Sequence, residues 1–277
     1  YRGKDPKNYV KFNNETWRII GVFPTDDGTG NIENRIKLVR NDSIGEYKFD
    51  DGTTAYNYSK QDNLMLLQYN NKSKVEYLEK DKNYNVIMVA ASVNGYNNWA
   101  RPASSNRDLN GTYYSNLISE AKNMIGQAKY YLGGYESSSI LTQDMYSYER
   151  KISGTAYYND TNPNNWIGKI GLMYVSDYGY ASSNCENKKI WDDSNSSSND
   201  IRACNTTNWL FKGNSEWTLP QGASISFSAF YVFSGGYVSD LSVSLGQFAA
   251  RPVLYLISSV QITGGNGTSS SPYTLGL

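Results

Sequence analysis

The chain of 277 residues contains no histidine. Histidine is the commonest general base in enzymes and the commonest zinc ligand. Its absence excludes a Ser-His-Asp triad, a Cys-His catalytic pair and a zinc site of the HExxH type. Net charge is absent as well, because 26 Lys and Arg residues balance 26 Asp and Glu residues. A neutral chain has no bulk attraction for nucleic acid or for an anionic membrane, and we expect neither as a partner.

Long apolar runs are also missing. No stretch approaches the ~18 apolar residues of a membrane-spanning helix, so we expect no direct membrane insertion of this segment. The opening residues do not form a signal peptide, and Tyr1 is not a natural start. We therefore expect an ectodomain, extracellular or on the cell surface, whose secretion signal or N-terminal anchor has been removed.

Cysteine is scarce, with two residues, Cys185 and Cys204, flanking a polar, serine-rich segment. A disulfide between them would close a short loop and stabilise the fold by about 3 kcal/mol in the chain-entropy model. We predict this disulfide, and with it an oxidising location outside the cytoplasm. Two free buried thiols are the alternative, and a thiol titration distinguishes the two.

Tyrosine is abundant, with 25 residues. Its rigid, amphipathic ring is enriched in binding surfaces. An A/T-rich genome would raise Tyr together with Asn, Lys and Ile, all of which are frequent here. Composition alone supports both explanations equally.

Hydrophobic patterns predict strands at both ends of the chain. A hairpin is expected over 9–12 and 16–23, with its turn at Asn13 and Asn14, followed by a strand over 35–40. Near the C-terminus, a hairpin is expected around 229–238, a buried strand over 251–256, and two short strands in the tail after residue 259.

Helices are expected in the middle of the chain. Apolar residues at helical spacing predict a helix within 109–134, ended by Gly133 and Gly134, and a second helix is expected over 143–151. The segment 64–80 fits one or two short helices, and 85–93 fits a strand or a helix. A strand is expected over 169–175, followed by a turn at Asp177.

These elements predict one α+β domain over 1–277. It has antiparallel sheets, one or two packing helices and a high loop content, with an insertion around 52–105.

Candidate sites for metals and phosphates are weak. The stretches GTGN and GGNGT lack the strand–loop–helix setting of a phosphate loop and are better explained as turns. The acidic segment 192–200 resembles a calcium loop in composition but lacks the EF-hand glycine and the terminal glutamate. A structural calcium ion there stays an open alternative to a solvated loop. We expect no catalytic residue, no metal and no cofactor.

The segment 217–256 carries the most information. It begins with WTLP, ends with RPVLYL, and contains AFYV and GGYV between them, with almost no charge. This set of motifs resembles C-type-lectin-fold domains of bacterial and phage surface proteins. The opening YVKFNNETWRIIGV and the stretch LNGTYY resemble the same family. Pro220 directly after Leu219, and Ala249-Ala250 before Arg251, depart from the family pattern.

The resemblance implies a C-type-lectin-like fold, shared by sulfatase-modifying enzymes and by the variable proteins of diversity-generating retroelements. In the variable proteins a stable scaffold displays a diversified patch near the C-terminus. Alternation along the strands assigns a scaffold role to Ala229, Tyr231, Val238, Val253 and Tyr255. Residues expected at or near the exposed, ligand-binding face are Ser224, Ser226, Phe227, Ser228, Phe233, Ser239, Leu241, Ser242, Ser244, Leu245, Gln247 and Phe248.

We therefore predict a non-enzymatic adhesion or receptor-recognition domain that binds a protein or glycan on another cell or phage through 217–256. One alternative is a pilus or pseudopilin-like subunit, including a tip adhesin, which would require an apolar segment upstream. A second is an enzyme of the sulfatase-modifying type. That family's chemistry is copper-dependent cysteine oxidation, and the positions of Cys185 and Cys204 around a polar loop argue against it.

Overall fold

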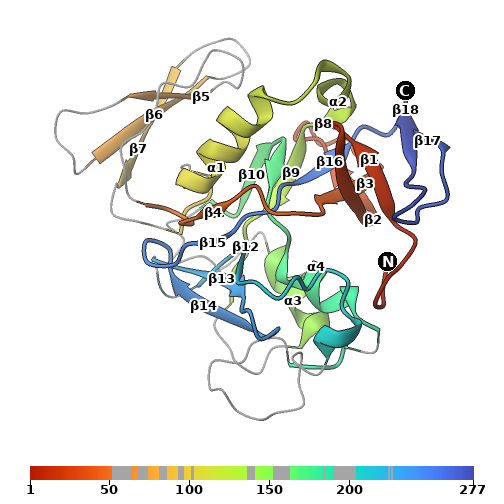
Figure 1. Ribbon diagram of the computed structural model, residues 1–277. Coiled ribbons are helices and arrows are strands. Elements are labelled where there is room, and N and C mark those ends of the chain that lie inside the picture. The colour runs from red at the N-terminus through yellow and green to blue at the C-terminus, as the bar shows by residue number, and fades with distance from the viewer. Residues whose placement is uncertain are drawn as a thin grey trace.

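The computed structural model describes residues 1–51, 97–100, 103–135, 141–151, 163–183, 185–189, 204–223, 225 and 227–277, and the backbone of three strands between 64 and 92. This part of the chain is α+β, with mostly antiparallel sheets and short helices, as predicted (Figure 1).

The first sheet joins the two ends of the chain. Its strands, in spatial order, are β1 (Tyr9–Phe12), β2 (Glu15–Asp26), β3 (Ile32–Arg40), β16 (Val253–Leu256) and β11 (Ile170–Gly171), and β8 (Ile125–Gly126) also pairs with β16. Asn13 and Asn14 have φ of 54° and 59°, the left-handed conformation that a two-residue hairpin turn of type I′ requires. The predicted opening hairpin and the strand within 251–256 are therefore confirmed.

The second sheet comes almost entirely from the segment 217–256. Its order is β14 (Val238–Ser242), β13 (Ser228–Val232), β12 (Glu216–Gln221), β15 (Phe248–Ala249) and β4 (Glu46–Tyr47). The turn between β13 and β14 contains Gly236, whose φ of 89° is strained for any residue with a Cβ atom. This hairpin was predicted, and it supplies the edge strand of the sheet, β14.

Three smaller sheets complete the strands. They are β9 (Ala128–Tyr131) with β10 (Asn165–Gly168), β17 (Gln261–Gly264) with β18 (Thr274–Gly276), and the three-stranded set β5 (Leu64–Leu67), β6 (Lys74–Lys80) and β7 (Val86–Ser92). The tail strands were predicted. The helices predicted over 64–80 are wrong, because β5 and β6 pair as antiparallel strands. The remainder of 52–96 lies outside the described residues, so the insertion around 52–105 stays a prediction.

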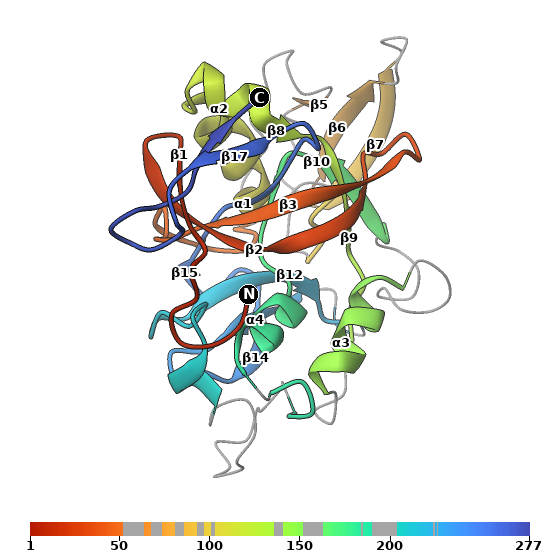
Figure 2. The ribbon, with the colours of Figure 1, turned by 90° about the vertical axis from the view of Figure 1, so that its right-hand side faces the viewer.

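The helices are short. They are α1 (Ser104–Asp108), the π-helical turn η1 (Leu109–Tyr113), α2 (Ser119–Met124), α3 (Thr142–Glu149), α4 (Val175–Ala181) and the 3-10 turn η2 (Asn205–Thr207). α3 confirms the helix predicted over 143–151. The helix predicted within 109–134 is wrong beyond Met124, where β8 and β9 follow. In Figure 2, α1 and α2 lie above the β2–β3 hairpin, and α3 and α4 lie below it.

Ile125–Gly126 and Ala128–Tyr131 form strands, although their apolar residues also fit helical spacing. Burial alternates residue by residue along β9, which is the period of a strand. Gly133 and Gly134 do not end a helix. A Cβ atom on Gly133 would lie 2.0 Å from the carbonyl oxygen of Tyr148, and one on Gly134 would lie 2.3 Å from that of Gln221. The two glycines therefore let the chain pass closely between α3 and β12.

The strand predicted over 169–175 is wrong in its second half. β11 ends at Gly171, and Val175 already begins α4. Asp177 does not form a turn. It lies in the first turn of α4, where its Oδ2 atom accepts the backbone N–H of Tyr174 at 2.8 Å. A carboxylate at this position stabilises the start of a helix.

The inner strands of both central sheets are covered on both faces. Neighbouring residues of one strand belong to two different apolar clusters: Leu38 and Val39 on β3, and Phe230 and Tyr231 on β13. Every residue of β12, β13 and β16 is buried. Sheets that are buried on both sides explain why the strands near the C-terminus are nearly continuous apolar runs.

The predicted disulfide between Cys185 and Cys204 is present, with Cα atoms 6.3 Å apart. Both cysteines are buried in the second apolar cluster. The acidic segment 192–200, for which a calcium ion was considered, lies outside the described residues. None of the described helices is both long and apolar enough to cross a membrane.

Candidate ligand-binding surface

The two ends of the segment 217–256 are anchored in the core. Trp217 is fully buried and donates its Nε1–H to the carbonyl oxygen of Tyr47 at 2.7 Å. Arg251 is also buried, and its Nε donates to Glu216 at 2.7 Å while one terminal nitrogen donates to the carbonyl oxygen of Leu210 at 2.8 Å. A buried ion pair with this geometry fixes the start of β12 relative to the residues that lead into β16.

The aromatic side chains between these anchors form a row across the second sheet. Tyr231 pairs with Trp217 across β13 and β12, and Phe248 pairs with Tyr47 across β15 and β4. Ring centroids are 5.9 Å apart for Trp217 and Tyr231, 4.8 Å for Trp217 and Phe248, and 4.4 Å for the stacked pair Tyr231 and Phe248. Contacts of this kind stabilise the row beyond simple burial.

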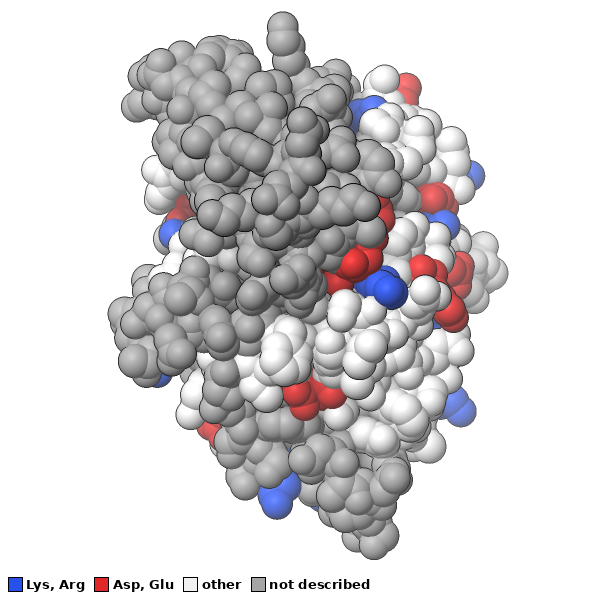
Figure 3. Space-filling model, turned by 90° about the vertical axis from the view of Figure 1, so that its left-hand side faces the viewer, with Lys and Arg blue, Asp and Glu red and all other residues white. Residues whose placement is uncertain are grey.

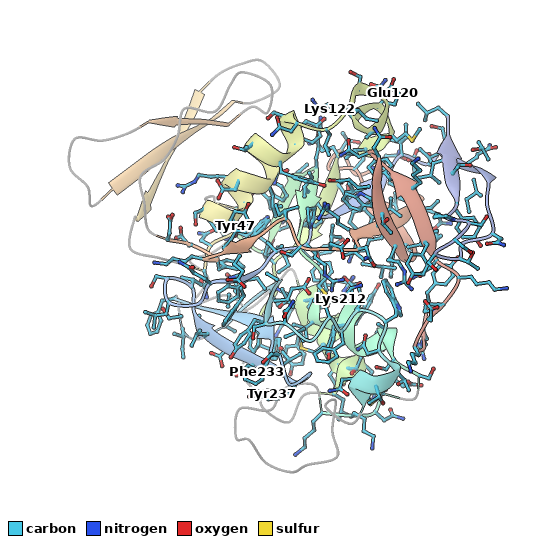
Figure 4. All side chains as sticks on the ribbon, viewed as in Figure 1. Tyr47, Glu120, Lys122, Lys212, Phe233 and Tyr237 are labelled. Carbon is cyan, nitrogen blue, oxygen red and sulfur yellow. A yellow bond between two sulfur atoms is a disulfide. The ribbon has the colours of Figure 1, made fainter. Side chains whose placement is uncertain are left out.

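The row reaches the surface at both ends. Phe233 stacks on Tyr237 at the β13–β14 turn, with ring centroids 4.7 Å apart, and lies 6.3 Å from Tyr231. Phe233 and Tyr47 are both half-buried. Figure 4 places Tyr47 at one end of this sheet and Phe233 and Tyr237 at the other.

The loop before β13 is held in place by one buried amide. The Nδ2 atom of Asn97 lies within 3.1 Å of the carbonyl oxygens of Gly222, Ile225 and Ser228. Next to this loop, Val243 donates its N–H to the carbonyl oxygen of Phe227 at 2.8 Å. The loops before β13 and after β14 are therefore joined.

These loops display an apolar patch. We define the apolar patch as Phe227, Leu241, Leu245 and Phe248. Phe227 is 54% exposed and Leu245 is 73% exposed, whereas Leu241 and Phe248 are half-buried and pack on the core. Leu241 and Phe248 meet at Gly246, where a Cβ atom would lie within 3.0 Å of both side chains. Figure 3 shows the side of the molecule that lies at the left of Figure 1, where the described surface is mostly uncharged (white), with acidic (red) and basic (blue) residues among it.

Apart from Ser228, the expected surface residues divide into three groups. Phe227, Leu245 and Gln247 are exposed, and the half-buried ones are Phe233, Ser239, Leu241, Ser242, Ser244 and Phe248. Ser224 and Ser226 lie outside the described residues. The expected scaffold residues are all buried: Ala229, Tyr231, Val238, Val253 and Tyr255.

The expectation that Ser228 faces solvent is wrong. Ser228 is 3% exposed, and its hydroxyl donates to the carboxylate of Asp240 on the neighbouring strand β14. A buried hydroxyl needs such a partner, so Ser228 connects the two strands of the hairpin rather than contacting a ligand.

Sequence reasoning missed two residues of this surface. Tyr47 belongs to β4, and no local pattern links it to a strand 201 residues later in the chain. Ile225, 41% exposed, lies in the loop anchored by Asn97. An apolar residue within a serine-rich stretch was the sequence feature that could have identified Ile225 as part of this surface.

The surface combines three kinds of side chain. It offers exposed apolar side chains, serine hydroxyls and the Gln247 amide on a rigid base. Among the described residues, no group of three or more Cys, Asp or Glu side chains is arranged to hold a metal ion. The chain matches no family model, no curated protein and no solved structure.

Proposed function

We propose that the domain binds a protein or glycan on another cell or phage through the apolar patch. The observation that carries this proposal is the exposure of Phe227 and Leu245 on two loops joined by a backbone hydrogen bond, while Leu241 and Phe248 of the same segment pack on the core. Exposed apolar side chains on a fixed base lose little conformational freedom on binding and mark interaction sites. The half-buried serines at the rim would add adaptable hydrogen bonds.

We further propose a C-type-lectin-like fold and an extracellular location. The opening hairpin and the RPVLYL strand, two pieces that carry the resemblance, lie in the first sheet on either side of β3, and the WTLP strand is central in the second. The disulfide supports an oxidising compartment.

The binding proposal is tested with a double variant, Phe227→Ser with Leu245→Ser. The labelled 277-residue chain is applied to an array of defined glycans and, by flow cytometry, to intact bacteria. Wild type should bind at least one target, and the double variant should lose at least tenfold in affinity with an unchanged circular dichroism spectrum. Ile262→Ser, at a 47% exposed position of β17, is the matched control and should bind like wild type.

Equal binding by wild type and the double variant would overturn the proposal, as would the absence of binding by wild type to every target. Equal losses for the double variant and for Ile262→Ser would also count against it, because the binding would then not depend on the apolar patch.

Diversification of the segment 217–256 is part of the same proposal. Its support is structural: the buried frame of Trp217 and Arg251 is separate from the exposed positions Leu245 and Gln247, so the exposed positions tolerate change. Sequencing the locus tests it. A near-identical template repeat beside a reverse transcriptase gene is the expected result, and the absence of both refutes diversification without affecting the binding assay.

A further inference from the structure

One lysine of the chain lies entirely inside the protein. Lys37, near the middle of β3, has no exposed surface, and β2 and β16 pair on either side of it. Its Nζ atom lies 4.4 Å from the ring centre of Tyr174, 5.5 Å from that of Tyr255 and 5.6 Å from that of Phe23. Lysine is rarely found fully buried, because removing the ammonium group from water is unfavourable.

The partner of this lysine is a carboxylate that is just as confined. Asp177 is 7% exposed, and its Oδ2 atom lies 2.5 Å from the Nζ atom of Lys37. The same Oδ2 atom accepts the N–H of Tyr174. Lys37 and Asp177 are separated by 140 residues in the chain, and their contact joins β3 to the first turn of α4.

The surroundings disfavour separated charges. Glu149, fully buried on α3, accepts hydrogen bonds from the N–H and the hydroxyl of Ser176, the residue before Asp177. Burial, with a smaller contribution from the Asp177 charge, raises the pKa of Glu149 to about 7. Arg150 is paired with Glu149 at 3.3 Å. The Lys37–Asp177 pair therefore lies next to a second ion pair, in a region where all four side chains are largely removed from water.

We propose that Lys37 and Asp177 condense into an intramolecular isopeptide bond. The ammonium group transfers a proton to the carboxylate, and the resulting amine attacks Cγ of Asp177. The new bond joins Nζ to Cγ, and the bond from Cγ to Oδ1 breaks. Two of the three ammonium hydrogens leave with Oδ1 as water, and the third stays on the amide nitrogen. Charge is conserved, because one cation and one anion become one neutral amide and one water.

The geometry supplies what this condensation needs. In water, an amine and a carboxylate do not condense, but groups fixed in contact react with effective concentrations on the order of 10⁵ M or more. Lys37 is fixed by a strand with neighbours on both sides, and Asp177 by the first turn of α4. The Tyr174 N–H points at Oδ2, which becomes the amide oxygen, and therefore stabilises negative charge on that atom during the attack.

The experiment is an intact mass measurement on the purified 277-residue chain, denatured and with its disulfide reduced. The expected mass is lower than the sequence mass by one water molecule. Trypsin should release residues 36–40 joined to residues 170–188, because cleavage after Lys37 is blocked. A chain at full sequence mass, with the two peptides separate, overturns the proposal.

Two variants identify the origin of any mass loss. Lys37→Arg keeps a cation opposite Asp177 but cannot form the amide, so it should have its full sequence mass. Lys129→Arg is the matched control, because Lys129 forms an ion pair with Asp26 at 3.3 Å in a site that is partly open to water. It should still lack one water. A mass loss that persists in Lys37→Arg would assign the dehydration to another site and overturn the proposal.

Discussion

Glu149 makes the stability of the domain depend on pH near neutrality. Burial raises its pKa from an ordinary value of 4.5 to about 7 in the folded chain. Between these two values the folded state binds more protons than the unfolded state, so the free energy of unfolding falls as pH rises. The contribution is fully present below about pH 4.5 and is lost above about pH 7. The shift of 7 − 4.5 corresponds to about 3 kcal/mol.

Replacing the carboxyl group by an amide isolates this contribution. Glu149→Gln cannot ionise, yet its amide oxygen still accepts the N–H of Ser176 and its NH₂ group donates to the Ser176 hydroxyl. The unfolding free energy of the variant minus that of wild type should increase by about 3 kcal/mol as pH rises from about 5 to about 8. Glu216, which is also buried with a raised pKa, is present in both proteins and cancels in the difference.

The assay is urea denaturation at several pH values, followed by tryptophan fluorescence with the disulfide intact. Glu120→Gln is the control, because Glu120 is exposed on α2 and its replacement should leave the pH dependence of wild type unchanged (Figure 4). A difference between Glu149→Gln and wild type that stays constant across the pH range would refute the reasoning. It would mean that Glu149 is solvated or fully compensated by Arg150.

Three further predictions concern stability and are measured by the same denaturation assay. Trp217→Ala should lower the unfolding free energy by about 3–5 kcal/mol, because it empties the centre of the aromatic row and removes the bond to β4; a loss below about 1 kcal/mol would contradict that packing. Replacing Cys185 and Cys204 by alanine should cost about 3 kcal/mol, because the bridge spans 19 residues; unchanged stability would show that the loop is constrained by other contacts. Glu216→Ala should cost about 3–5 kcal/mol by leaving Arg251 buried without its carboxylate, and adding Arg251→Met should recover much of the loss; additive losses would contradict this account.

Short-range features of the fold were predictable from the sequence. Asn13 and Asn14 adopt the left-handed conformation that their position between two strands indicated. The hairpin through Gly236 and the short tail strands depend on similarly local turn chemistry. The disulfide was predictable because Cys185 and Cys204 are close in the chain and have no other cysteine with which to pair.

Patterns that fit two structures misled the prediction. Apolar residues around 117–128 fit helical spacing, but β8 pairs with β16 from the far end of the chain, and that pairing decides their conformation. On β13, the alternation of side chains between the two faces did not distinguish buried from exposed residues, because both faces of this strand are covered. The exposed half of the proposed binding surface therefore comes from the loops beside β13 and β14, at Phe227 and Leu245.

The sequence by itself determined the turns, the strands at both ends, the disulfide and the exclusion of histidine chemistry, because each depends on residue identity or on neighbours a few positions away. Only the tertiary structure decided which side chains of 217–256 face solvent. It alone also brought Lys37 to Asp177 and buried Glu149 between α3 and α4. Burial and charge pairing depend on what packs against a residue, and the partners are distant in the chain, as with Lys37 and Asp177, 140 residues apart.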